Sequence, residues 1–583
     1  MTIKERMIYS LDRVFVLLFD RIGLSIVRTF ELDRAIISAM IRANPRVYGA
    51  RIVGYTLIAL LIGIAIVGAA LLVRPSIVLL VIMVLAGVLL PLLVFILFIA
   101  YPVMAMSRRK RLIESELPFF ASYISIMARG GVPIAKAMEA FRRTPLFKGI
   151  RLETQEFFRK LGLFGGDPIA TLEEISYYHP SQIFKDFMLG YIVTYRTGGD
   201  VVRYLETRVE EFFRKQEEMI KQMIQKLGVY MEAYMVTSII GGLGLLILFT
   251  SAGWIQGGRF AVTSYDPTVL ILFNFVGLPL LSVAIIYGAH TAQSKWGFEL
   301  RDVIYLALLV ATVSPLPYLL VILAIGGYQV FSGIYTKQAI LGQVLGIAIA
   351  LLTISTPAWL AYRRATKGLR ALERYTALYI ENVSGLRKTG LAPERCFIEA
   401  SKGEYGPLNP IVRRLAAAIE MGIDIEEAIR RSLYGVRSWL IRVIFRLAID
   451  AVKVGGGSPE IFYLLARYAS AIAEAYERLR TNLRIYVFLP YIGAILFAIT
   501  STVYISLVIA QPPPMIGGRE IDTATIYRLS LMASLASIMN AWMMGIVAGK
   551  ISGLSVGEGF KHATILTTIT TIVIWIFVQM FIP

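Results

Sequence analysis

Nine long apolar runs divide this sequence, and each is long enough to form a helix that crosses a membrane. A bilayer core of about 30 Å is crossed by about 20 residues of α-helix. The runs cover residues 52–73, 77–101, 229–253, 268–289, 303–325, 339–362, 485–510, 526–549 and 563–582. We therefore expect an all-α, polytopic membrane protein with about nine transmembrane helices.

Two long hydrophilic stretches, residues 102–228 and 363–484, lie between groups of these runs. In both stretches apolar residues recur every three or four positions, and the strict alternation typical of β-strands is lacking. We expect each stretch to fold as a small helical bundle, called domain 1 and domain 2 below.

The order of these segments repeats along the chain. Two apolar runs, a hydrophilic domain and two further runs form a unit that occurs twice, with the ninth run left over. Equivalent runs start 251 to 262 residues apart, which indicates an internal duplication. Each unit crosses the membrane an even number of times, so the two copies are parallel. We expect six segments in chain order. They are an N-terminal amphipathic segment (1–51), transmembrane helices 1–2 (52–101), domain 1 (102–228), transmembrane helices 3–6 (229–362), domain 2 (363–484) and transmembrane helices 7–9 (485–583).

Turn residues recur at equivalent places in the two domains. The Gly-Val-Pro sequence at 131–133 has a counterpart, Gly-Leu-Ala-Pro, that starts 259 residues further on. The sequence Thr-Gly-Gly-Asp at 197–200 precedes a long periodic helix, and Gly-Gly-Gly-Ser-Pro at 455–459 does the same in domain 2. Gly often ends a helix and Pro often starts one. The residues expected to form turns between helices are Gly131, Pro133, Gly198, Gly199, Asp200, Gly390, Pro393, Gly456 and Gly457.

The distribution of charge predicts the orientation in the membrane. The chain is 57% hydrophobic and 17% charged, and its 59 Lys and Arg residues outnumber its 40 Asp and Glu residues. With the N-terminus inside, 54 of the 59 basic residues lie on the cytoplasmic side, in agreement with the positive-inside rule. We therefore expect the N-terminus inside, the C-terminus outside and both domains in the cytoplasm. Residues 1–51 are either an amphipathic helix on the inner membrane surface or a cytosolic helix packed on the rest of the protein.

Patterns typical of catalytic and metal-binding sites are lacking in the sequence. The single cysteine, Cys396, excludes a disulfide framework, and His179, His290 and His562 lie far apart, so we expect no metal site, no cofactor and no enzyme activity. The run Gly545–Ser552 looks like a phosphate-binding loop, but its two glycines are one residue too close together. We interpret this run, like the other glycine clusters, as a tight turn between helices.

Two kinds of basic cluster need separate explanations. The runs at 107–111 and 363–364 directly follow apolar runs, so positive-inside anchoring and attraction to anionic lipids explain them. Domain 2 also has a basic excess deeper in its sequence, with 21 basic against 13 acidic residues. This excess favours an acidic protein partner, whereas no nucleic-acid recognition pattern accompanies it, so nucleic acid is not expected. The predicted partner-binding residues are Arg413, Arg414, Arg430, Arg431, Arg437, Arg442 and Arg446.

Several short motifs, in this order within the repeat, resemble the type II secretion F family. They are Glu-Leu-Pro-Phe-Phe at 116–120, the Gly-Val-Pro turn, and the Thr-Gly-Gly-Asp turn followed by Leu205, Arg208 and Glu210 with the spacing Leu-x-x-Arg-x-Glu. The resemblance covers the chain from about residue 52 to its end. Domain 2 departs from the pattern, since 372–375 lacks Leu-Pro and Gly457-Ser458 replaces Gly-Asp. Nine crossings with two large inner domains are most similar to the platform proteins of archaella and archaeal type IV pili.

The resemblance implies a non-enzymatic platform in the cell membrane, under a growing filament. A homodimer is one arrangement that the resemblance allows. Such a platform binds a cytoplasmic hexameric secretion ATPase and passes its movements to pilin or archaellin subunits entering the filament. On this basis we expect the basic surface of domain 2 to contact the ATPase and the Gly-Gly turns to act as pivots. The alternatives are a transporter built from a parallel repeat and a membrane anchor for another cytoplasmic machine.

Overall fold

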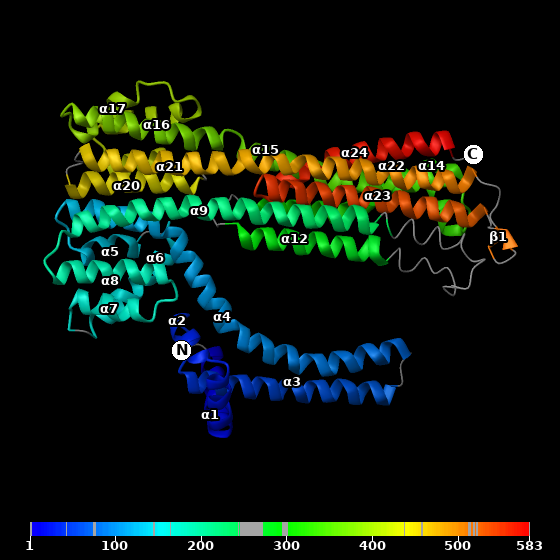
Figure 1. Cartoon of the computed structure of the whole chain (residues 1–583), viewed down its shortest axis with the longest axis horizontal. Coiled ribbons are helices and arrows are strands. Elements are labelled where there is room, and N and C mark those ends of the chain that lie inside the picture. Colours follow the sequence, from blue (N-terminus) through cyan, green and yellow to red (C-terminus); the bar gives the residue numbers. More distant parts are fainter. Residues whose placement is uncertain are drawn as a thin grey trace. The chain divides into compact units, whose positions relative to one another are not determined.

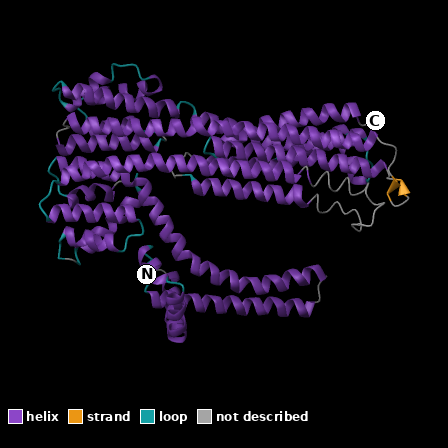
Figure 2. Ribbon diagram, viewed as in Figure 1, coloured by secondary structure: helices purple, strands orange, loops and turns teal. Residues whose placement is uncertain are grey.

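Helices form nearly all of the regular structure in the described part of this computed structural model (Figures 1 and 2). The structure describes residues 3–41, 43–73, 77–143, 146–163, 165–242, 244, 272–293, 301–436, 438–455, 459–510, 515–516, 519–520 and 523–581. Within these ranges the only strands are an antiparallel pair of two residues each, β1 (Met515–Ile516) and β2 (Arg519–Glu520). The expected all-α fold is confirmed.

The chain divides into two units. One comprises Met1–Phe213 and Leu447–Ile461, and the other comprises Arg214–Arg446 and Phe462–Pro583. The helices up to the division are α1 (Ile3–Thr29), α2 (Leu32–Ser38), α3 (Pro45–Val73), α4 (Ile77–Arg129), α5 (Ile134–Arg143), α6 (Lys148–Leu161), α7 (Pro168–Tyr177), α8 (Gln182–Arg196) and α9 (Val201–Val236), whose last part belongs to the second unit.

The remaining helices follow in chain order. They include two π-helical segments, η1 and η2, and three 3₁₀ segments, η3 to η5. Their bounds are η1 (Thr237–Gly241), η2 (Phe273–Gly277), α12 (Leu278–Ala292), α13 (Arg301–Val313), α14 (Pro315–Ile325), η3 (Gly327–Ser332), α15 (Lys337–Thr366), α16 (Leu369–Lys388), α17 (Pro393–Ala400), η4 (Gly406–Leu408), α18 (Asn409–Glu420), α19 (Ile425–Ser432), α20 (Trp439–Gly455), α21 (Pro459–Arg484), η5 (Ile485–Val487), α22 (Phe488–Ala510), α23 (Thr523–Ser552) and α24 (Val556–Phe581).

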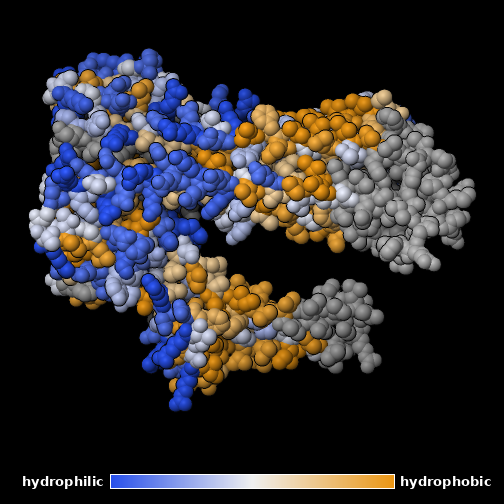
Figure 3. Space-filling view, viewed as in Figure 1, coloured by the Kyte–Doolittle hydropathy of each residue, from blue (hydrophilic) through white to orange (hydrophobic). Residues whose placement is uncertain are grey.

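Eight stretches of helix among the described residues are long and apolar enough to cross a membrane. They are Pro45–Gly68, Leu89–Arg129, Phe273–Ala292, Asp302–Ile325, Lys337–Lys388, Leu465–Val503, Ser530–Ser552 and Val556–Met580. Each overlaps one of the nine predicted runs, and Figure 3 shows hydrophobic surface along such helices and hydrophilic surface over α5 to α8. The protein is therefore a multi-pass membrane protein. The remaining predicted run, 229–253, is the third in chain order and lies partly outside the described residues.

Helix boundaries differ from the apolar runs in two places. The second predicted run and the first helix of domain 1 are one continuous helix, α4, even though Pro91, Pro102 and Pro118 lie inside it. The fifth predicted run is instead interrupted between α13 and α14, where Pro315 starts α14. Pro315 suits the first position of α14, where its missing backbone N–H breaks no hydrogen bond of that helix. Hydropathy alone gives no sign of this break.

Aromatic side chains fill the cores of both domains at matching positions. In domain 1, Phe120 packs against Phe141 and Phe187, with ring centroids 5.2 and 6.5 Å apart. In domain 2, Tyr379 lies 259 positions after Phe120 and packs against Phe445, with ring centroids 6.1 Å apart. Phe120 and Tyr379 are both almost completely buried. The duplication therefore extends from the sequence to the packing of the domain cores.

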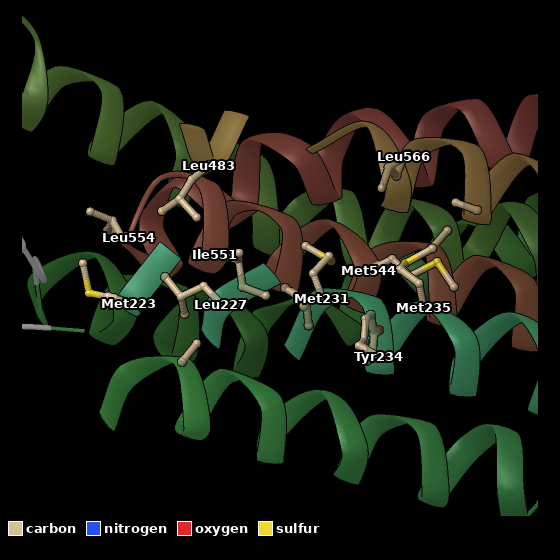
Figure 4. Packing of buried hydrophobic residues seen from close by; sticks show 14 of the residues in the cluster. Met223, Leu227, Met231, Tyr234, Met235, Leu483, Met544, Ile551, Leu554 and Leu566 are labelled. Atoms are coloured by element: carbon tan, nitrogen blue, oxygen red, sulfur yellow. The ribbon is translucent and has the colours of Figure 1, made fainter. Parts of the chain in front are cut away.

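A methionine-rich cluster packs the second half of α9 against the C-terminal membrane helices (Figure 4). Thioether side chains are flexible and fill irregular gaps between helices well. The labelled members are Met223, Leu227, Met231, Tyr234, Met235, Leu483, Met544, Ile551, Leu554 and Leu566. The second half of α9, from Arg214 onward, therefore belongs to the packing of the membrane helices.

Close backbone packing joins α23 to α24 and corrects one expectation. The predicted turn around Gly545 and Gly549 is wrong, because both residues lie inside α23. A Cβ on Gly549 would overlap the backbone of Gly559, and a Cβ on Gly545 would overlap that of Ala563. Glycines four residues apart allow membrane helices to approach until their backbones touch. The glycines that resemble a phosphate-binding loop therefore serve helix packing.

Candidate partner-binding surface

The two domains contain the same succession of helices. Five helices of domain 1, α5 to α9, correspond in order to five helices of domain 2, α17 to α21. Each helix of domain 2 starts 257 to 261 residues after its counterpart. A surface feature that occurs at the same turn in both domains therefore belongs to the duplicated fold.

The predicted turn residues that are described lie at helix ends. Gly131, Gly198 and Gly390 have φ angles of 74°, 71° and 86°, a left-handed backbone conformation in which glycine carries no steric penalty. Pro133 immediately precedes α5, and Pro393 is the first residue of α17.

The Thr-Gly-Gly-Asp turn links α8 to α9 with its own hydrogen bonds. The N–H of Gly199 donates to the carbonyl of Thr194 at 2.9 Å. The side chain of Asp200 caps α9 by accepting from the N–H of Arg203 at 3.0 Å. The predicted turn residues of domain 2, Gly456 and Gly457, lie outside the described residues.

Four of the predicted basic residues lie on or beside α18 and α19. Arg430 and Arg431 both pair with Glu427 and are 76% and 63% exposed. The hydrogen bond from Arg431 is the largest of the effects that lower the pKa of the Glu427 carboxyl. Arg413 lies 3.4 Å from the Glu404 carboxylate. Arg414 spans α18 and the end of α19, because it donates to the carbonyls of Pro410 and Ser432.

The other predicted basic residues have different environments. Arg442 donates to the carbonyl of Val436, within the segment that leads into α20. Arg446 pairs with Glu426 at 2.9 Å and thereby fastens α20 to α19. Both side chains therefore make contacts that stabilise the domain. Arg437 lies outside the described residues.

Large exposed side chains at two turns of each domain were missed by the sequence reasoning. In domain 2, Met421 and Tyr434 lie just beyond the ends of α18 and α19 and are 79% and 88% exposed. In domain 1, Leu163 and Tyr177 lie at the equivalent turns and are 79% and 64% exposed. Exposed aromatic and Met side chains are enriched where proteins bind partners. Aligning the two repeats turn by turn would have identified this signal.

A buried charged cluster fastens the N-terminal segment to domain 1. Arg109 of α4 forms a bidentate salt bridge with the carboxylate of Glu153 of α6, at 2.7 and 2.6 Å. It also donates to the carbonyl of Ser38 at 2.5 Å. The Nε2 atom of His179 lies 3.4 Å from the same carboxylate. The His179 Nδ1 accepts from the N–H of Ser181 at 3.0 Å, so Nε2 carries the hydrogen that faces Glu153.

This cluster controls the ionisation of Glu153. Burial by itself would raise the pKa of the carboxyl, but the hydrogen bond from His179 and the charge of Arg109 outweigh burial and lower the pKa to about 2. The cluster is structural in character, because Arg109 and His179 both face the carboxylate of Glu153 in the interior of the domain. No group of three or more His, Cys, Asp or Glu side chains that could hold a metal ion occurs among the described residues.

Comparison with known proteins agrees with this duplicated architecture. The family model for protein F of the type II secretion system matches residues 120–249 and 379–506. A protein of Methanocaldococcus jannaschii whose own role is uncharacterized is 18% identical over 494 residues, which cover 81% of each chain. No solved structure matches the chain.

The two family matches coincide with the repeat found in the sequence. They start 259 residues apart, the same distance that separates the Gly-Val-Pro turn from its counterpart. Members of this family are membrane platform proteins of secretion or pilus systems and are generally not enzymes. The chain therefore carries the domain of type II secretion system protein F twice.

Proposed function

We propose that this protein is the cell-membrane platform of an archaeal type IV pilus-like filament, either a pilus or an archaellum. It couples a cytoplasmic hexameric secretion ATPase to the insertion of pilin or archaellin subunits into the filament base. The observation that carries the proposal is the pair of F-family domains, each placed in the chain between membrane-crossing helices. The similarity to a protein of the archaeon Methanocaldococcus jannaschii supports an archaeal system.

The helical connections support a role in transmitting movement. Domain 1 follows the membrane-crossing part of α4 without a break, because α4 extends from Ile77 to Arg129. The same domain leads on through α9, one helix of 36 residues. Helices of this length bend only gently unless a residue interrupts them. Pro102 and Pro118 lie inside α4, where proline bends a helix, but no loop lies between the membrane-crossing part of α4 and domain 1, so a displacement of the domain would be passed along a helix.

The ATPase would contact domain 2 at α19 and its two flanking turns. Arg430 and Arg431 supply exposed positive charge there, and Met421 and Tyr434 supply exposed apolar surface. Aromatic, Met and Arg side chains are enriched at specific protein interfaces. This surface suits an acidic partner, since charge complementarity favours encounter and orientation.

The test reverses the charge at Arg430 and Arg431 to Glu in the full-length protein. After purification from the native membrane, we expect the hexameric ATPase to be lost from the double variant but retained by the wild type. The control is Lys402→Glu, another exposed cation that pairs with a carboxylate three positions away. Unchanged ATPase recovery with the double variant would contradict the proposed contact. Recovery of neither ATPase nor pilin with the wild type would contradict the platform function itself.

A further inference from the structure

The N-terminal helix α1 exposes a surface that its own unit does not cover. Its inner face packs on α3 through Phe15, Gly23 and Val27, which are buried. The opposite side contains two edges of different chemistry. Val14, Leu18 and Ile22 recur every four residues and are 48%, 65% and 56% exposed. We call these three residues the apolar edge.

The second edge of α1 is positively charged. Arg13, Arg21 and Arg28 are all exposed, and their spacings of eight and seven residues place them on one side of a helix with 3.6 residues per turn. We call these three residues the basic edge; the largely exposed Leu17 lies beside it. The nearby acidic residue Asp12 faces α3, where it pairs with Arg51 at 2.6 Å. The uncovered side of α1 is therefore apolar along one edge and basic along the other.

The orientation of α1 is fixed by tight packing on the membrane-crossing helix α3. A Cβ on Gly23 would lie 2.5 Å from the backbone N of Ala50, so the two backbones are in direct contact. The Phe15 ring lies over Gly54 in the same way. Figure 1 shows that α1 crosses the beginning of α3 instead of running along it. The membrane-crossing stretch of α3 begins at Pro45, so these contacts lie in its first turns.

From this geometry we propose that α1 lies in the plane of the membrane, at the interface of an anionic lipid leaflet. Because α3 crosses the bilayer, a helix that crosses its first turns lies along the bilayer surface. The apolar edge then contacts the acyl chains, and the basic edge contacts lipid phosphates. Helices of this composition lie about 5–10 Å deep in the boundary between headgroups and acyl chains. Arg side chains near a membrane surface are attracted to anionic lipid headgroups.

This placement has a consequence for domain 1. Ser38, at the end of α2, accepts a hydrogen bond from Arg109 and donates one to the carbonyl of Tyr178 at 3.0 Å. The segment that contains α1 and α2 is therefore fastened both to α3 and to domain 1. A lipid-bound α1 holds domain 1 close to the membrane surface.

The test uses single cysteines in the full-length protein, reconstituted into phosphatidylcholine nanodiscs with and without phosphatidylglycerol. The native Cys396 is completely buried, and burial raises the pKa of its thiol, so it should label slowly and can remain in place. Spin labels are attached at Leu18→Cys and at Arg13→Cys. Reference positions are Leu61→Cys, on the exposed side of α3, and Lys402→Cys on domain 2.

We expect the label at position 18 to collide with oxygen several-fold more than with a water-soluble nickel chelate, as the label at position 61 does. The label at position 13 should favour the nickel chelate. Nickel accessibility at position 18 equal to that at position 402 would place α1 in water and overturn the proposal. Protection of position 18 from both reagents would mean that protein, such as a second copy of this chain, covers the edge, and would also overturn it.

A second measurement covers the case in which the cysteine variants fail to fold. Arg21 and Arg28 are changed together to Glu in the otherwise native protein, and the rise in melting temperature caused by phosphatidylglycerol is measured. We expect a clear loss of this rise relative to wild type and to Lys402→Glu. An unchanged rise would overturn the electrostatic part of the proposal. These outcomes are independent of ATPase binding, so they leave the proposed platform function unaffected.

Discussion

The contact between α23 and α24 predicts a specific loss of stability for Gly559→Ala. The added Cβ would lie 2.6 Å from the carbonyl oxygen of Ile546 and 2.8 Å from its Cα, whereas ordinary van der Waals contact is 3.4–4 Å. Both atoms belong to the backbone of α23 and cannot rotate away. The two helices must therefore separate by close to 1 Å at this point, and the packing of neighbouring side chains along the contact is weakened.

The expected magnitude combines two opposing effects. Overpacking a tight contact costs about 1–3 kcal/mol, and a backbone-to-backbone contact belongs near the upper end of that range. Replacing Gly by Ala inside a helix gains at most about 1 kcal/mol. We therefore expect a net destabilisation of about 2 kcal/mol, measured as a lower midpoint of unfolding in an SDS titration of the full-length protein.

The matched control is Gly68→Ala, in the membrane-crossing helix α3. A Cβ at Gly68 would meet no described atom within 4 Å, so only the helix-propensity gain should remain, and the variant should be as stable as wild type or slightly more stable. If Gly559→Ala and Gly68→Ala have the same midpoint, the close approach of α23 and α24 is refuted. A loss at Gly559 of less than a few tenths of a kcal/mol would refute it as well.

Two further predictions concern domain 1. Glu153→Gln leaves Arg109 buried without its carboxylate, which should lower the free energy of unfolding by about 3–5 kcal/mol. In the wild-type protein the pKa of Glu153 is lowered from 4.5 to about 2. The ionised carboxylate therefore adds stability above pH 4.5, and this contribution is lost as the pH falls towards 2. Acid melts of both proteins check this, and equal pH slopes would refute it. At Gly198, which has a left-handed backbone, Gly198→Asn should still support filament assembly, whereas Gly198→Val should not. Filaments are counted by electron microscopy. Equal assembly by the two variants would contradict the requirement for a left-handed turn.

The sequence alone predicted the features that depend on hydropathy and order. Eight apolar runs correspond to described helices able to cross a membrane, because a run of apolar residues has few alternatives to a lipid-exposed helix. The duplication was predictable as well, since the turn that starts at Gly131 and its counterpart at Gly390 preserve their spacing. Periodicity also identified both domains as helical bundles.

Features that depend on which residues meet across the fold were not predictable. Arg446 and Arg430 look alike in the sequence, but Arg446 pairs with Glu426 across two helices whereas Arg430 is largely exposed. The link from Arg109 to Ser38 joins residues 71 positions apart, and no local pattern encodes it. Gly545 and Gly549 could be assigned to packing only after α24 was seen beside them.

The connections into the two domains differ in a way that bears on how each could move. The chain enters domain 1 along the unbroken helix α4. It enters domain 2 through a break, because α15 ends at Thr366 and Gly368 has a φ angle of 80° before α16 begins. A left-handed glycine between two helices is a local change of direction, and such single residues absorb changes in φ and ψ when neighbouring elements move. The same duplicated fold is therefore entered along a continuous helix in domain 1 and through a left-handed glycine in domain 2.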